Sequence, residues 1–348
     1  MSKQSQEVDS NSTAYQAGGS ITVHQGLTYG EAKTVALDVF NANFFKLAEV
    51  AKDVAETRAR EITERILQRL QDSNPDGLEQ ARDPGFQYSL FSVQKEYACT
   101  GDEALGDLLV DLLVERSREE RRSFIQIVLD ESIKTAPKLT DGQLAALTTI
   151  FLLRYTKNVG ISNLDDLVAH LDKVIRPLAG AWAKSAPSFQ HLQFAGCGAI
   201  EMMPHDLVEH LKANYGGIFM RGFSPEEIAA KGIDLQQNHP VFVRCLNGGD
   251  LGQLAAINYG ALDELFNKTG IDEATGEKLR EVYREQLLAS DKVRDLIVSR
   301  CDYMGELFDL WSPEPMGGFS LTSVGMAIGH ANLRRIANGF TDLSVWIH

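Results

Sequence analysis

The sequence has few cysteines, and they lie far apart. Cys99, Cys197, Cys245 and Cys301 are the only ones among 348 residues, and no two of them form a close pair. A disulfide framework and a zinc knuckle both need several cysteines at short, regular spacings, so neither is expected. A protein of this kind fits a reducing compartment, and we predict a cytoplasmic location.

Long apolar runs are also missing. No stretch approaches the roughly 18 consecutive apolar residues of a membrane-spanning helix. The first residues, MSKQSQEVDSNSTAYQAGGS, are polar where a signal peptide would need an apolar segment. We therefore expect neither export nor contact with a membrane.

Positive charge is scarce. The chain has 34 lysines and arginines against 48 aspartates and glutamates, which gives a formal net charge of −14. Such a charge repels nucleic acid and anionic lipid over most of the surface. The one basic cluster near a possible recognition helix is Arg334 and Arg335 with His330, which is far smaller than a nucleic-acid footprint. Nucleic acid is therefore not an expected partner.

The residues that are abundant predict a mainly α-helical globular protein. Hydrophobic residues make up 44% and charged residues 24% of the sequence, as in an ordinary folded protein. The apolar residues recur mostly with the helical period, and the length allows two or more cooperative units. We expect a polar leader over 1–25, a long amphipathic helix over 26–72, a helical bundle over 85–185 and a mixed α+β region, with helices and short strands, over 186–348.

The predicted N-terminal helix carries a long apolar stripe. Thr28 and Glu31 have the spacing of a capping box, and no proline or glycine follows until Pro75. At 1.5 Å per residue the helix would span roughly 60 Å, which is longer than a small domain is wide. We therefore predict that its stripe mediates self-association, or else folds back on the bundle. The residues proposed for self-association are Phe40, Phe44, Leu47, Ala51 and Val54.

Local signals place further elements in the bundle. Turn-forming residues predict a linker over 72–85, and the charged run 115–122 is most simply a solvated turn of helix. Thr140 and Gln143 repeat the capping-box pattern before an almost wholly apolar helix over 144–155, which we place at the centre. A further helix is expected over 164–182, with a kink at Pro177.

The second half of the chain is rich in glycine and proline from 186 to 250. A short helix begins at Ser224–Pro225, and Val241–Cys245 is the best internal strand. Two long helices are expected over 251–268 and 273–299. A helix that opens at Leu321–Gly325 should end near Asn338–Gly339, and Leu343–Ile347 should close the chain as an apolar strand, an order compatible with a winged-helix-like module.

Cys197 is the strongest candidate for catalysis. It lies between Gly196 and Gly198, which could let a substrate approach, and His191 and His205 are near it in sequence. Catalytic partners are brought together by the fold, however, and a cysteine among Phe, Ala and Ile is more often a small buried hydrophobe. The structural interpretation is therefore favoured over a Cys197–His191 nucleophile pair.

Two other motifs also favour a structural interpretation. Glu201, His205, Glu209 and His210 are of the types that bind metals, but the two histidines are five residues apart where a helical zinc pair needs four. The segment Gly248–Gly252 follows a predicted strand, yet it has neither the Lys-Ser/Thr of a P-loop nor a dinucleotide fingerprint. We interpret it as a strand-to-helix turn capped by Asp250, and we predict no metal and no cofactor.

Several segments resemble those of a bacterial family. Residues 11–21 resemble an Asn/Ser-Gly leader found on many bacterial conflict and phage-defence proteins, and 26–51 resemble the helical segment that often follows it. With 147–161, 189–200, 321–336 and 342–347, the chain is similar along most of its length to a family with no established activity. The resemblance implies a place among defence proteins and assigns no catalytic residue.

The expected function follows from these interpretations. We predict an oligomeric scaffold, sensor or effector subunit of bacterial antiviral defence that acts through protein contacts, with itself and with a defence-system partner. Two alternatives stay open: a hydrolase-like effector that uses Cys197, and a winged-helix nucleic-acid sensor.

Overall fold

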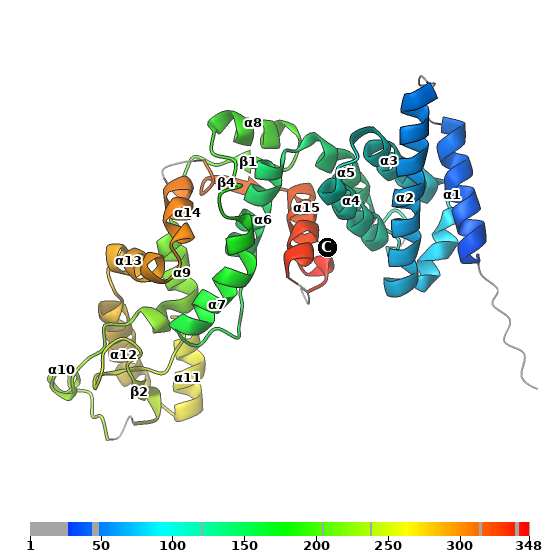
Figure 1. The fold of residues 1–348 in the computed structure, drawn as a ribbon. Coiled ribbons are helices and arrows are strands. Elements are labelled where there is room, and N and C mark those ends of the chain that lie inside the picture. Colours follow the sequence, from blue (N-terminus) through cyan, green and yellow to red (C-terminus); the bar gives the residue numbers. More distant parts are fainter. Residues whose placement is uncertain are drawn as a thin grey trace, which may run out of the picture.

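The protein is a curved array of helices (Figure 1). The computed structural model describes residues 27–43, 49–119, 121–203, 205–236, 239–312, 315–337 and 341–347. Helices dominate, and the strands form two small two-stranded antiparallel sheets. The prediction of a mainly α fold with a smaller mixed α+β region is thereby confirmed.

The N-terminal end of the array contains five helices. They are α1 (Tyr29–Asn43), α2 (Glu49–Ser73), α3 (Pro84–Thr100), α4 (Glu103–Arg116) and α5 (Phe124–Thr135). The capping box of α1 is present, because the Thr28 amide donates to Glu31 and the Glu31 amide donates back to the Thr28 hydroxyl. The predicted linker over 72–85 is mostly a 3-10 helix, Pro75–Arg82.

Two antiparallel helices replace the single long N-terminal helix that the sequence predicts. Lys33, early in α1, pairs with Glu64, far along α2, whereas Phe40, late in α1, is buried against Ala55 and Ala59. The helices therefore form a hairpin, in which each covers part of the other's apolar face. Burying a Phe side chain is worth about 1.5–3 kcal/mol, and a straight helix would leave that side chain in water. The sequence has no proline or glycine near Asn43, where α1 ends. Helical periodicity alone therefore predicts a helix that continues past this residue.

Helices α6 (Asp141–Tyr155) and α15 (Ser323–Ile336) form the centre of the molecule. The predicted capping box at Thr140 is present, and α6 is buried over most of its length, as expected. Helix α15 returns from the end of the chain to pack along α6 and against α4 and α5 (Figure 1).

The other half of the array contains shorter helices. They are α7 (Leu164–Val174), α8 (Ala186–Phe194), α9 (Leu207–Tyr215), α10 (Pro225–Ala230), α11 (Ala261–Thr269), α12 (Glu273–Gln286), α13 (Ser290–Arg300) and α14 (Tyr303–Trp311). The predicted helix over 164–182 ends at Val174, because Pro177 occupies a separate 3-10 turn. The predicted helix over 273–299 is divided into α12 and α13 at Leu287, whose backbone is extended.

The strands pair segments that lie at different distances in sequence. Strand β1 (Gly198–Ile200) pairs with β4 (Phe319–Leu321), and β2 (Phe242–Arg244) pairs with β3 (Gly252–Leu254). The strand predicted over Val241–Cys245 is therefore confirmed for its three central residues, Phe242–Arg244. The prediction that Gly248–Gly252 is a strand-to-helix turn is wrong, because this segment connects the two strands of the β2–β3 hairpin. Within the hairpin, the Arg244 side chain donates a hydrogen bond to the Gly249 carbonyl at 2.7 Å.

The end of the described chain is a 3-10 turn, Leu343–Val345, where the sequence predicts a strand. Leu343 and Ile347 are buried in the main core, and the Trp346 indole donates to the Tyr155 carbonyl at 2.7 Å. A turn points these three side chains inward together, which an alternating strand cannot do. A winged-helix-like module would need a strand after α15, and residues 341–347 do not form one.

Two large apolar cores hold most of the molecule together, and two small clusters lie in the N-terminal part of the described chain. The larger takes buried side chains from Ala36 to Ile347, on both sides of residue 185. A smaller core is built from residues between Met220 and Tyr283, including Phe223, Phe266 and Leu279. The second half of the chain thus contributes to both cores, with the hairpin β2–β3 and α10 to α12 around the smaller one.

Candidate functional site

Cys197 is a buried side chain at the end of α8. It is fully buried, and its backbone carbonyl accepts a hydrogen bond from the Thr322 amide at 3.0 Å. Burial raises the pKa of its thiol to about 12. Because the thiolate is the nucleophile, a thiol that stays protonated near neutral pH is a poor catalyst.

His191 is held by a different element. Its Nδ1 lies 3.0 Å from the side-chain amide nitrogen of Gln143, in the first turn of α6. Within the described ranges, no hydrogen bond joins the Cys197 thiol to an imidazole, and burial is the main influence on that thiol. The structure does not bring Cys197 and His191 together as a nucleophile and base.

The acidic and histidine residues after β1 are paired with other groups. Glu201 lies 3.2 Å from Arg154 and 3.5 Å from His205, and His210 lies 2.9 Å from Asn214. The part of the chain that the structure describes contains no group of three or more His, Cys, Asp or Glu residues placed to hold a metal ion.

The basic cluster at the end of α15 faces acidic residues of α4. Arg334 pairs with Glu115 at 2.8 Å, and Arg335 lies 3.7 Å from Asp107. These ion pairs occupy the guanidinium groups that a nucleic-acid interface would use.

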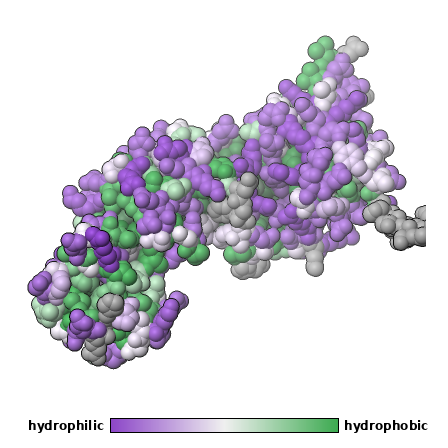
Figure 2. Space-filling model, turned by 60° about the horizontal axis from the view of Figure 1, so that its bottom comes forward, coloured by the Kyte–Doolittle hydropathy of each residue, from purple (hydrophilic) through white to green (hydrophobic). Residues whose placement is uncertain are grey.

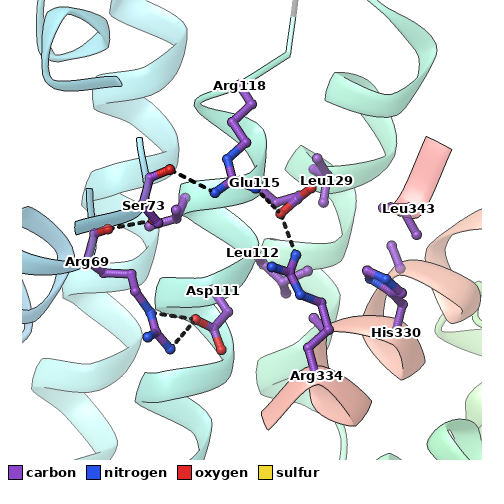
Figure 3. A pocket seen from close by; sticks show the side chains of 13 residues that line it. Arg69, Ser73, Asp111, Leu112, Glu115, Arg118, Leu129, His330, Arg334 and Leu343 are labelled. Carbon is purple, nitrogen blue, oxygen red and sulfur yellow. Dashed lines mark hydrogen bonds and ion pairs between the residues drawn. The ribbon is translucent and has the colours of Figure 1, made fainter. Parts of the chain in front are cut away.

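Glu115 is the centre of a small cavity between α2, α4, α5 and α15 (Figure 3). The cavity holds about 180 Å³. The Glu115 carboxylate accepts hydrogen bonds from Arg334 at 2.8 Å and from Arg118 at 3.3 Å. Arg118 also donates to the Ser73 carbonyl at the end of α2. One buried carboxylate thus joins three segments that are distant in sequence.

A second ion pair closes the same cavity. Arg69 of α2 donates from Nε at 3.0 Å and from Nη2 at 2.8 Å to one oxygen of Asp111 on α4. His330 of α15 is buried nearby and its Nε2 lies 2.8 Å from the Thr341 carbonyl, so this nitrogen carries the proton. Burial lowers the pKa of His330 below its usual value, which keeps the ring neutral near pH 7.

The charged groups that line this cavity pair with one another. Its three arginines and two carboxylates are joined in ion pairs: Arg69 pairs with Asp111, and Arg118 and Arg334 share Glu115. Its volume is below the roughly 300 Å³ at which small-molecule pockets begin. The cavity is not predicted by the sequence, because the charged run 115–122 is typical of a solvated turn of helix. Glu115 and Arg116 are in fact buried, and the apolar residues on both sides of Glu115 in α4 were the available signal.

The residues proposed for self-association have different environments. Phe40 is buried inside the α1–α2 hairpin, which counts against its facing a second copy. Ala51 and Val54, in the first turns of α2, are exposed, whereas Phe44 and Leu47 lie outside the described residues. Figure 2 shows hydrophobic residues at this tip of the molecule, beside a mostly hydrophilic surface over the N-terminal helices.

The comparisons with known proteins assign the chain to a family. No curated protein and no solved structure matches the chain. No helix among the described residues is both long and apolar enough to cross a membrane. A protein-family model matches residues 26–347. Because this match covers nearly the whole sequence, the chain belongs to that family.

Proposed function

We propose that the protein is an oligomeric scaffold, sensor or effector subunit of bacterial antiviral defence that acts through protein contacts. The observation that carries the scaffold role is the exposed apolar face at the start of α2. Val50 is 79% exposed and Val54 is 46% exposed, and the two lie one helical turn apart. The defence role rests on the resemblance of the leader and of the segments that follow it.

The exposed face continues an apolar stripe that is buried further along the same helix. Ala55, Ala59, Ile62 and Ile66 of α2 all contact other helices of the chain. Towards the tip, the described residues leave Val50 and Val54 at the exposures given above. Contiguous exposed apolar residues are typical of a protein interface, so we assign this face, made of Val50, Ala51 and Val54, to self-association.

A second copy of the chain is the proposed partner, because two-fold symmetry doubles the apolar surface that this small face can bury. In a two-fold dimer both copies contribute the same face, so the two valines of each copy give four buried side chains. A fully exposed valine gains about 1.5 kcal/mol on burial, and because these two are 79% and 46% exposed, the four side chains contribute roughly 4 kcal/mol before association costs. The α1–α2 hairpin lies at one end of the array (Figure 1).

The test compares two valine variants by light scattering at tens of micromolar. Val54→Glu places a charge in the proposed interface, and we expect a folded monomer where the wild type is a dimer or larger. Val159→Glu is the matched control, because Val159 is 91% exposed on a loop after α6, and it should keep the wild-type mass. A wild type that is monomeric at this concentration would remove the self-association proposal.

The defence role needs a cellular test. Cells that carry the wild-type protein and its genomic neighbours should survive phage challenge better than cells that carry Val54→Glu. Cys197→Ala should protect as well as the wild type, because a buried thiol has no catalytic part in a scaffold. If Cys197→Ala abolished protection while folding and mass stayed normal, the hydrolase alternative would replace the scaffold.

A further inference from the structure

A wider cleft lies between the end of α6, α7 and the C-terminal turn. It has a volume of about 480 Å³, within the usual range of roughly 300–1,000 Å³ for small-molecule pockets. Residues that line it include Lys157, Asn158, His170, Lys173 and Trp346. It is distinct from the Glu115 cavity and from the α2 tip.

The charge of this cleft is opposite to that of the protein. Lys157 and Lys173 line it, and none of the described residues that line it is an aspartate or glutamate. Across the described ranges, neither lysine has an ion-pair partner within hydrogen-bonding reach. Two unpaired ammonium groups in a chain of net charge −14 form a local site that attracts anions.

His170 adds a hydrogen-bond donor with a defined tautomer. The side-chain oxygen of Asn158 accepts from the Gly160 amide at 2.9 Å, which fixes the orientation of the Asn158 amide. Its nitrogen therefore faces Nδ1 of His170 at 3.0 Å, and Nδ1 must accept. Burial lowers the pKa of His170, and the proton of the neutral ring is then on Nε2, which leaves this nitrogen as the ring's donor.

Trp346 supplies an aromatic wall. Its ring is half-buried, and its indole nitrogen donates to the Tyr155 carbonyl at 2.7 Å. The ring also packs edge-on against Phe151, with centroids 5.0 Å apart and an interplanar angle of 68°. These contacts fix the ring, so a planar ligand could stack on it with little loss of side-chain entropy.

We propose that this cleft binds a small organic phosphate with an aromatic ring, of the nucleotide class. Lysines bind phosphate as point charges, and the Nε2–H of His170 adds a directed hydrogen bond. Stacking of a nucleobase on an aromatic side chain contributes about 1–3 kcal/mol. The proposal adds a ligand to the scaffold role but does not depend on it.

The test is titration calorimetry of the full-length protein with ATP, tripolyphosphate and adenosine. ATP should bind more tightly than either fragment, because only ATP contacts both the lysines and Trp346. Lys173→Gln and Lys157→Gln should each weaken ATP binding about tenfold, which corresponds to the loss of one charge-assisted contact. Lys268→Gln, an exposed residue on α11, is the control and should bind as the wild type does.

Two results would overturn the proposal. One is the absence of heat or of a fluorescence change with millimolar ATP in a protein whose circular dichroism is native. The other is equal ATP affinity in the wild type, Lys157→Gln and Lys173→Gln. Binding of tripolyphosphate as tight as that of ATP, unchanged in Trp346→Phe, would overturn the nucleotide class. Since light scattering measures self-association separately, failure of either proposal leaves the other testable.

Discussion

Gly325, in the first turn of α15, lies directly against the backbone carbonyl of Cys197. A Cβ atom at Gly325 would stand 1.9 Å from the Cys197 oxygen. The same oxygen accepts a hydrogen bond from the Thr322 amide at 3.0 Å, and the Thr322 hydroxyl donates to the Gly196 carbonyl at 2.6 Å. The start of α15 is therefore docked on the chain that leads into β1.

This contact predicts that Gly325→Ala destabilises the protein. The added methyl group cannot fit without a backbone shift, and overpacking of this kind costs about 1–3 kcal/mol. Gly305→Ala in α14 is the matched control, since its Cβ would be 3.7 Å from Val298, and it should be neutral or slightly stabilising. Urea unfolding of the two variants measures the difference. Equal stability of Gly325→Ala and the wild type would contradict the observed packing.

The Glu115 cavity predicts a stabilising role for its ion pairs. Glu115→Ala leaves Arg118 and Arg334 without their shared carboxylate, and we expect a loss of about 1–2 kcal/mol of unfolding free energy. This figure is discounted because the two arginine side chains are 33% and 39% exposed.

The control for this prediction is a surface pair. Glu131→Ala removes the partner of Lys134 on the exposed face of α5, and the change should stay within about 0.5 kcal/mol. Thermal and urea unfolding of both variants provide the measurement. A Glu115→Ala protein as stable as Glu131→Ala would show that the cavity pairs contribute nothing.

One buried histidine, His330, and two half-buried ones, His170 and His210, predict a loss of stability in mild acid. Burial lowers the pKa of His170, His210 and His330 in the folded protein. In the unfolded chain a histidine has a pKa near 6.5. Below that pH the unfolded chain binds protons that the folded chain does not bind. The stabilisation present above about pH 6.5 is therefore lost as pH falls through the folded values.

Urea unfolding between pH 7.5 and 5.5 tests this expectation. Each histidine contributes a slope of at most about 1.4 kcal/mol per pH unit, and His330→Gln should reduce the total slope. The carboxylates whose pKa is lowered, such as Asp172, titrate in more acidic solution and do not interfere. A flat unfolding free energy over this range would contradict the prediction.

The cysteines should differ in their reactivity. Cys99 is exposed, whereas Cys197, Cys245 and Cys301 are buried. A brief treatment of the native protein with iodoacetamide should label Cys99 alone, and unfolding in urea should release the other three. Mass spectrometry of the intact protein counts the labels, and Cys99→Ala should remove the fast one. Rapid labelling of Cys197 in the folded protein would contradict this prediction and support the hypothesis that Cys197 is a nucleophile.

Features confined to a few consecutive residues could be predicted from the sequence. The capping boxes at Thr28 and Thr140 and the helix start at Ser224 are confirmed, because each depends on side chains only three residues apart. The central position of α6 also followed from its composition, since a helix that is apolar all round must be buried.

Features that join distant segments were decided by the tertiary structure. Periodicity showed an apolar stripe before residue 72 but could not say that the chain folds back, because a straight and a folded stripe have the same pattern. Arg334, which pairs with Glu115, is 219 residues away on α15. The cleft lined by Lys157 and Lys173 likewise takes its residues from the end of α6, from α7 and from the C-terminal turn. Which charges are buried, and which stay unpaired, depends on three-dimensional neighbours that no local spacing specifies.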